Sequence, residues 1–217
     1  MLHAKIMEAK KLMMSEASLV EKMVSMSIDG LYNGNEDLLR EVLIFEDRVN
    51  QIELELDDMC TGIIALHQPE AKNLRLVLMI YRINNDLERL GDQAVNIAES
   101  VGHLVRDPVV SSVPELAQMK KYALAMLKNS LDAFAREDLA QSRRVCDADD
   151  VVDKLNRKIY RQLVELIKAD PHLTERYLHL LRISKNLERI GDLSTNIAED
   201  NVYLVSGEVI KHRRNEE

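Results

Sequence analysis

The segment RINNDLERLGDQAVNIAE at residues 82–99 returns as RISKNLERIGDLSTNIAE at residues 182–199, and the two copies share eleven of eighteen residues. The apolar positions before each copy also align, at an offset of 103: Val42, Val49, Ile52 and Leu56 correspond to Val145, Val152, Leu155 and Ile159. An internal repeat of this length indicates that one structural unit has been duplicated. We therefore expect a chain with two similar halves.

Each half has the pattern of three long helices. Apolar residues recur at steps of three and four, which is typical of a buried helix face, as in Val42, Phe45, Val49, Ile52, Leu56, Met59, Ile63 and Leu66. Proline costs about 3 kcal/mol inside a helix, so the four prolines mark helix boundaries: Pro69, Pro108, Pro114 and Pro171. The predicted helices span residues 2–32, 36–67, 70–105, 113–136, 138–168 and 172–206.

Short connections place successive helices antiparallel and side by side. The sequence therefore predicts an all-α fold of two tandem antiparallel three-helix bundles related by the internal repeat. We expect residues 106–114 to link a first domain, residues 1–107, to a second, residues 108–217. Gly91 and Gly191 lie in the middle of equivalent helices, where close helix packing or the approach of a bound ion would favour glycine. We prefer the packing interpretation.

The composition narrows the class of protein. Hydrophobic residues make up 46% of the chain and charged residues 30%, with a net charge of −8, so binding to a nucleic-acid phosphate backbone is not expected. Cys60 and Cys146 are far apart in the sequence, which argues against a zinc knuckle or a disulfide framework. The N-terminal residues mix charged and apolar types, and no apolar run is long enough to span a membrane. We expect a soluble, cytoplasmic protein.

Each copy of the repeat carries a Glu and an Asp four residues apart, Glu88 with Asp92 and Glu188 with Asp192. This spacing puts both carboxylates on one helix face, where like charges repel by a few tenths of a kcal/mol. A single such pair is usually part of a solvated surface. The same pair in both copies favours a shared role, and a cation between the carboxylates is one such role.

Folding each helical hairpin about its turn sets a second pair of oxygen-bearing side chains against the first. Because the rise per residue is equal along both helices, Glu46 falls opposite Asp92 and Asn50 opposite Glu88. Each half then gathers four such side chains in one patch without a lysine, which is unfavourable unless the patch is protonated or holds a cation. The predicted metal ligands are Glu46, Asn50, Glu88 and Asp92 in the first half, and Asp149, Asp153, Glu188 and Asp192 in the second.

The same register places Glu99 near Arg40, which we interpret as an ordinary ion pair. Asn96 lies one turn beyond Asp92 and could be an outer ligand or a polar residue at the rim.

The donor atoms of both patches are all oxygens, which favours hard cations such as Mg²⁺, Mn²⁺ or ferric iron, with zinc as a further candidate. Carboxylates can bridge, so each patch could hold more than one ion. The ligands come from only two helices per patch, so we expect a shallow surface cluster. A ferritin-like di-iron enzyme is disfavoured because none of the six histidines follows a Glu at a spacing of three. No nucleophile motif or glycine-rich phosphate loop is present, so we do not expect an enzyme.

The doubled LERxGD motif followed by Asn-Ile, each copy preceded by EDRVN at residues 46–50 or DDVVD at residues 149–153, resembles the PhoU family over nearly the whole chain. The resemblance implies two three-helix bundles, often a homodimer, with E(D)xxxD motifs that bind multinuclear metal clusters. The best matches to these motifs are Glu88, Asp92, Glu188 and Asp192, followed by Glu46, Asp149 and Asp153. Asn50 departs from the pattern and makes the first site less anionic.

The resemblance also implies a regulatory role. Members of the family act between the ATPase subunit of a phosphate ABC transporter and a membrane-bound sensor histidine kinase, and they repress the phosphate-starvation response when phosphate is ample. Two alternatives remain open from the residues: a metal-independent helical scaffold whose acidic face binds a basic partner, and a carboxylate-bridged metalloenzyme. Regulation of a different phosphate transporter is a narrower version of the first role.

Overall fold

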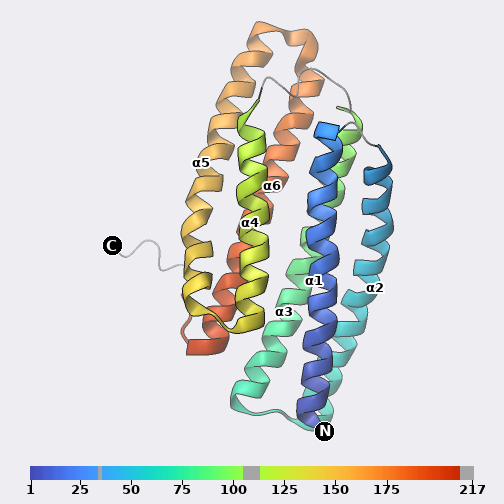
Figure 1. The fold of residues 1–217 in the computed structure, drawn as a ribbon, viewed down its shortest axis with the longest axis vertical. Helices are drawn as coiled ribbons and strands as arrows, with labels where there is room; N and C mark the ends of the chain where they lie inside the picture. The colour runs from blue at the N-terminus through green and yellow to red at the C-terminus, as the bar shows by residue number, and fades with distance from the viewer. Residues whose placement is uncertain (34–35, 105–112, 211–217) are drawn as a thin grey trace.

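The fold consists of two three-helix bundles. The structure, a computed structural model, describes residues 1–33, 36–104 and 113–210 (Figure 1). Within these residues the first half forms α1 (Leu2–Asn33), α2 (Glu36–His67) and α3 (Ala71–Gly102). The second half forms α4 (Glu115–Arg136), α5 (Leu139–Ala169), a 3-10 turn η2 (Pro171–Leu173) and α6 (Thr174–Ser206). The predicted all-α fold of two antiparallel three-helix bundles is confirmed.

The helix boundaries follow the prolines. Pro69 lies in the turn from α2 to α3, where Gln68 and Ala71 adopt positive φ angles of 43° and 46°. The turn η2 begins at Pro171, so α6 starts at Thr174, two residues later than expected. The third helix was expected to run to residue 105 and ends at Gly102. Most of the predicted linker, and with it the predicted domain boundary at residue 107, lies outside the described residues.

One continuous buried cluster fills the space between the helices and draws on all six. Its members include Ile6, Ile52, Leu87, Leu127, Ile159 and Leu187. The expected apolar face of α2 is buried at Val42, Val49, Ile52, Leu56 and Ile63. Leu66 does not belong to it: this side chain is 81% exposed, because it lies one residue before the end of α2, where the partner helices no longer cover it.

The two halves meet along α3 and α6, which pack against each other, while α1 contacts α4. In Figure 1, α1 and α4 lie in front of α3 and α6, and α3 and α6 run in opposite directions. Arg82 of α3 pairs with Asp200, near the end of α6, at 3.0 Å, and Arg182 of α6 pairs with Glu99 of α3 at 2.8 Å. Because Arg82 and Arg182 are equivalent in the repeat, these contacts reflect a pseudo-twofold relation between the halves.

The paired glycines lie in the buried interior of their bundles. A Cβ atom on Gly91 would meet Met23 and Val49 at 3.6 and 3.7 Å, and one on Gly191 would meet Val152 and Met126 at 3.4 and 3.7 Å. Both glycines are buried against apolar side chains of their own half. A Cβ at these distances would make ordinary van der Waals contacts, so the packing interpretation of the two glycines stays a prediction. None of the helices in the described residues is long and apolar enough to cross a membrane.

Candidate functional site

The acid patch of the second repeat lies along the hairpin of α5 and α6. Asp149 and Asp153 come from α5, and Glu188 and Asp192 from α6. Burial raises the pKa of Asp192, and the charges of Glu188, Asp149 and Asp153 raise it further, against the opposing charge of Arg189. The charges of the other three acids therefore act on the Asp192 carboxyl group, which agrees with the predicted hairpin register, in which Asp149 falls opposite Asp192 and Asp153 opposite Glu188.

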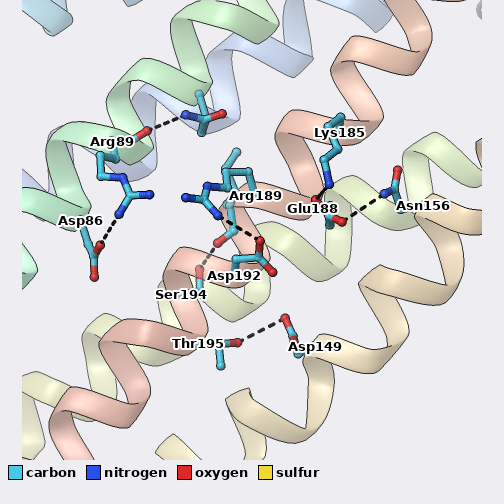
Figure 2. A network of polar contacts seen from close by, with 12 residues as sticks. Asp86, Arg89, Asp149, Asn156, Lys185, Glu188, Arg189, Asp192, Ser194 and Thr195 are labelled. Carbon is cyan, nitrogen blue, oxygen red and sulfur yellow. Dashed lines mark hydrogen bonds and ion pairs between the residues drawn. The ribbon is translucent and has the colours of Figure 1, made fainter. Parts of the chain in front are cut away.

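Basic and amide side chains enter this patch (Figure 2). Lys185 donates a hydrogen bond to the Glu188 carboxylate, Asn156 Nδ2 donates to Glu188 Oε1 at 3.4 Å, and Arg189 lies 3.5 Å from Asp192. The expectation of a patch without lysine was wrong. Lys185 is three residues before Glu188 on the same helix, which brings both side chains to the same face.

Two further contacts complete the arrangement. Thr195 Oγ1 donates to Asp149 Oδ1 at 3.3 Å, and Arg157 approaches Asp153 at 3.7 Å from one turn away on α5. Burial and the neighbouring Asp149 raise the pKa of Asp153 despite this arginine. The second patch is thus anionic but partly neutralised by side chains of its own repeat.

The acid patch of the first repeat lies along α2 and α3. Burial raises the pKa of Glu46, and Asp92 is the first of the charges that raise it further, which agrees with their predicted pairing. Burial also raises the pKa of Glu88, followed by the charges of Asp92 and Glu53, with Arg89 opposing. The structure therefore brings Glu46, Glu88 and Asp92 together. Glu53 of α2 is an acidic member of this patch that the sequence-based prediction did not include.

Asn50 is exposed on α2, next to the buried Val49. Its placement opposite Glu88 stays a prediction, as does the role of all eight residues as metal ligands.

A comparison with known protein families finds the same domain in both halves of the chain. The family model of the PhoU domain matches the chain twice, at residues 13–101 and 116–200. The chain belongs to the PhoU family. The phosphate-specific transport system accessory protein PhoU homolog of Aquifex aeolicus is 33% identical over 206 residues, which is 95% of this chain and 93% of that protein. The homolog of the same name in Deinococcus radiodurans is 36% identical over 188 residues, 87% of this chain and 88% of that protein.

Solved PhoU structures have the same fold. The crystal structure of PhoU from Pseudomonas aeruginosa has a TM-score of 0.91 and 32% sequence identity, covering 96% of this chain and all of that one. The phosphate transport system regulatory protein PhoU from Streptococcus pneumoniae has a TM-score of 0.89 and 25% identity, with coverage of 97% of this chain and 99% of that one. Membership in the PhoU family thus rests on sequence and on fold.

Some polar contacts of this PhoU-family chain differ from the prediction. Glu99 does not pair with Arg40: its partner is Arg182 of the other half, and Arg40 pairs with Asp37 at 3.8 Å. Arg182 Nη2 also donates to Asn96 Oδ1 at 2.6 Å. The hairpin register alone could not reveal this, because it considers one half of the chain at a time. Asn96 therefore helps to hold α3 to α6.

Besides Glu53, the sequence-based prediction did not include Glu16 of α1, whose side chain is 0% exposed. Burial, then Glu53 and Glu88, raise its pKa to about 9. Neither of its carboxylate oxygens has a hydrogen-bond partner within the described part of the chain. A signal for Glu16 was present in the sequence, since it lies three residues after Met13 and four before Val20 on the apolar face of α1.

The residues of both patches fit a hard cation in their chemistry. Their donors are carboxylate and amide oxygens, and Glu16 is fully buried where the charges of Glu53 and Glu88 act on it. Within residues 1–33, 36–104 and 113–210, no group of three or more His, Cys, Asp or Glu side chains is closely enough arranged to hold a metal ion. Binding would therefore require the carboxylates to change rotamer.

Proposed function

We propose that this protein is a regulatory accessory protein of phosphate uptake, without catalytic activity, that binds metal ions at its two acid patches. Its membership in the PhoU family and the names of its relatives support the link to phosphate transport. By extension from the family, it acts in the cytoplasm as an adaptor between the ATPase subunit of the phosphate ABC transporter and the membrane-bound sensor histidine kinase, and it forms a homodimer.

The metal-binding part of this proposal rests on one observation. In each hairpin, the negative charge of an acid on one helix raises the pKa of an acid on the other helix. Asp92 acts on Glu46 across α2 and α3, and Asp149 acts on Asp192 across α5 and α6. Such arrangements are unfavourable while the acids are ionised, and a cation between them removes the repulsion. The two patches occupy equivalent places in the repeat, which favours a common role over chance.

Metal binding at the first patch would affect how α2 packs on α3. A bound divalent or ferric ion, or a cluster of such ions, supplies positive charge to the patch. Glu88 and Asp92 would hold it from α3, and Glu46 from α2. Arg89 opposes the negative charge of Glu88 from the same helix. Metal occupancy would thereby stabilise the packing of α2 on α3, and in this proposal partner binding depends on that packing.

The proposal is tested with the double variant Asp92→Ala and Asp192→Ala. Protein from which metal has been removed with a chelator is titrated with Mn²⁺ or Fe³⁺, and bound metal is measured after desalting. We expect the wild type to retain metal and the variant to lose most of it. The control is Glu165→Ala, which removes an exposed acid that pairs with Lys168 at 2.8 Å outside both patches. A wild type that retains no metal after saturating titration would overturn the metal-binding role.

A pull-down from phosphate-replete cells, with and without chelator, tests the adaptor role. The wild type should capture the transporter ATPase or the kinase, and the chelator should reduce the amount captured.

A second candidate function is a metal-independent scaffold whose acidic face binds a basic partner. Lys185 and Arg189 in the second patch favour the metal-independent part of this candidate, because they already balance part of the negative charge that a metal ion would otherwise balance. It predicts capture of the same partners regardless of chelation.

A further inference from the structure

Glu16 is a costly residue for the fold. Its side chain is fully buried, and both of its carboxylate oxygens are without a hydrogen-bond partner among the residues that the structure describes. Removing a polar group from water without a compensating hydrogen bond costs about 1–3 kcal/mol, and a charged group costs more. The packing of α1 does not explain why an acid stands at this place.

The second repeat shows which residue the fold requires there. The first helices of the two halves align at the offset of 103. Ser27 and Ser130 then correspond, and each donates from its hydroxyl to the carbonyl three residues earlier, at 2.9 and 2.8 Å. Met23 and Met126 also correspond, and they face the equivalent glycines. In this alignment the counterpart of Glu16 is Met119, which is also fully buried. An apolar side chain therefore satisfies the fold at this position.

Met119 and the polar side chains near it form one layer of the second bundle. Hydrogen bonds link the polar groups of this layer. Ser184 Oγ donates to Asn156 Oδ1 at 2.7 Å and lies 3.4 Å from Met119 Sδ, and Asn156 Nδ2 donates to Glu188 Oε1. Lys185 provides a cation to the same glutamate. This layer holds one carboxylate, one lysine and neutral groups that satisfy one another.

The equivalent layer of the first repeat differs at every one of these places except that of Glu188. Glu16 replaces Met119, Glu53 replaces Asn156, and Asn84 replaces Ser184, while Glu88 is kept. Asn85 stands where the second repeat has Lys185, and its Nδ2 donates to the carbonyl of Tyr81. Compared with the second layer, the first gains two carboxylates and loses a lysine.

The acids of this layer act on one another through their charges. The charges of Glu53 and Glu88 both act on Glu16, and Glu53 acts on Glu88. Asn84 Nδ2 donates to the carbonyl of Glu53 at 3.0 Å and to Asp57 Oδ1 at 3.3 Å. The buried Asn84 Oδ1, like the Glu16 oxygens, accepts no hydrogen bond within the described ranges. One layer of the first bundle thus holds three carboxylates whose charges act on one another and a buried amide oxygen that accepts no hydrogen bond among the described residues, although in their present rotamers these acids do not form a group that could hold a metal ion.

We propose that Glu16 binds a hard divalent cation together with Glu53 and Glu88, so that the metal site of the first repeat draws on α1, α2 and α3. Glu53 and Glu88 are half-buried and open this layer to solvent, and Glu16 closes it from the core. The inference rests on the proposed metal role of the Glu88 patch and extends it: the first repeat holds its ion more deeply than the second, whose Met119 donates no oxygen. Carboxylate oxygens with an amide oxygen form the donor set that Mg²⁺ and Mn²⁺ prefer.

The test replaces Glu16 by the residue that the second repeat uses. Glu16→Met and the isosteric Glu16→Gln are made in a background with Asp149→Asn and Asp192→Asn, which weakens the second patch. The matched control in the same background is Met119→Leu. After chelation, Mn²⁺ binding is measured by calorimetry and by the electron paramagnetic resonance of free Mn²⁺, and melting temperatures are recorded with and without Mn²⁺.

We expect both Glu16 variants to lose about tenfold or more in Mn²⁺ affinity, while Met119→Leu retains the affinity of the background. Glu16→Met should melt higher than the background without metal and gain less on adding Mn²⁺. If Glu16→Met does not fold, Glu16→Gln answers the same question. Unchanged Mn²⁺ affinity in the Glu16 variants would overturn this inference alone. Absence of Mn²⁺ binding in the unsubstituted chain would overturn both this inference and the proposed metal function.

Discussion

A carboxyl group buried without a hydrogen-bond partner makes the stability of a protein depend on pH. Glu16 has its pKa raised from 4.5 to about 9, first by burial and then by Glu53 and Glu88. Below pH 4.5 the group is protonated in both the folded and the unfolded chain. Between pH 4.5 and 9 only the unfolded chain releases the proton, so the folded state loses stability as the pH rises.

Glu16→Gln should remove this loss. In the presence of chelator, the variant should exceed the wild type in free energy of unfolding by more at pH 8 than at pH 6. The limit for one proton is about 1.4 kcal/mol per pH unit. Urea unfolding at the two pH values measures the difference between the two proteins, so that other titrating acids cancel to first order. An equal difference at both pH values would contradict the burial of an ionisable Glu16.

Residues such as Glu16 mark how far sequence reasoning reaches at this scale. Glu88, Asp92, Glu188 and Asp192 could be found because their spacing of four occurs twice in aligned segments. A single acid on the apolar face of α1 has no such duplicate, since its counterpart is Met119. The hydrogen bonds of Lys185 and Asn156 to Glu188 depend on rotamers, which periodicity does not determine.

At the scale of the element, the repeat and the prolines determined most of the result. The steps of three and four indicated the helices. Proline marked the boundary between α2 and α3, the start of α4 and the boundary between α5 and α6, because proline in a helix interior is unfavourable. The start of α6 was predicted two residues too early. Asp170 Oδ1 accepts from the backbone N–H of His172 at 3.1 Å, and this local capping favours η2 before the helix begins.

Gly91 and Gly191 give a prediction about single helices. A mid-helix glycine is about 1 kcal/mol less favourable than alanine, and the Cβ of Gly91→Ala would meet its neighbours at ordinary van der Waals distances. Gly91→Ala should therefore raise the free energy of unfolding by up to about 1 kcal/mol. Gly191→Ala should gain less, because its Cβ would lie 3.4 Å from Val152 Cγ1. Thermal unfolding of both variants checks the order, and a loss of stability in Gly91→Ala would indicate that the glycine serves a closer approach than packing requires.

At the scale of the whole molecule, the sequence predicted two bundles but not how they join. The apolar faces of α3 and α6 are broad enough to cover both their own bundle and each other. A pattern of apolar positions does not state which partner covers which side. The contacts that orient the halves are Arg82 with Asp200 and Arg182 with Glu99, and each joins residues more than eighty positions apart in the chain.

These two equivalent arginines should differ in their contribution to stability. The Asp200 side chain is 2% exposed, so Arg82→Ala would leave a buried carboxylate without its arginine, at a cost of about 2–3 kcal/mol. Arg182 and Glu99 are about half exposed, and water and salt screen such a pair, so Arg182→Ala should cost about 1 kcal/mol or less. Because α1–α6 share one continuous core, each loss should appear as a shift of a single unfolding transition, measured by calorimetry. Equal costs would show that burial of Asp200 does not govern the junction, and a second transition would show that the halves unfold separately.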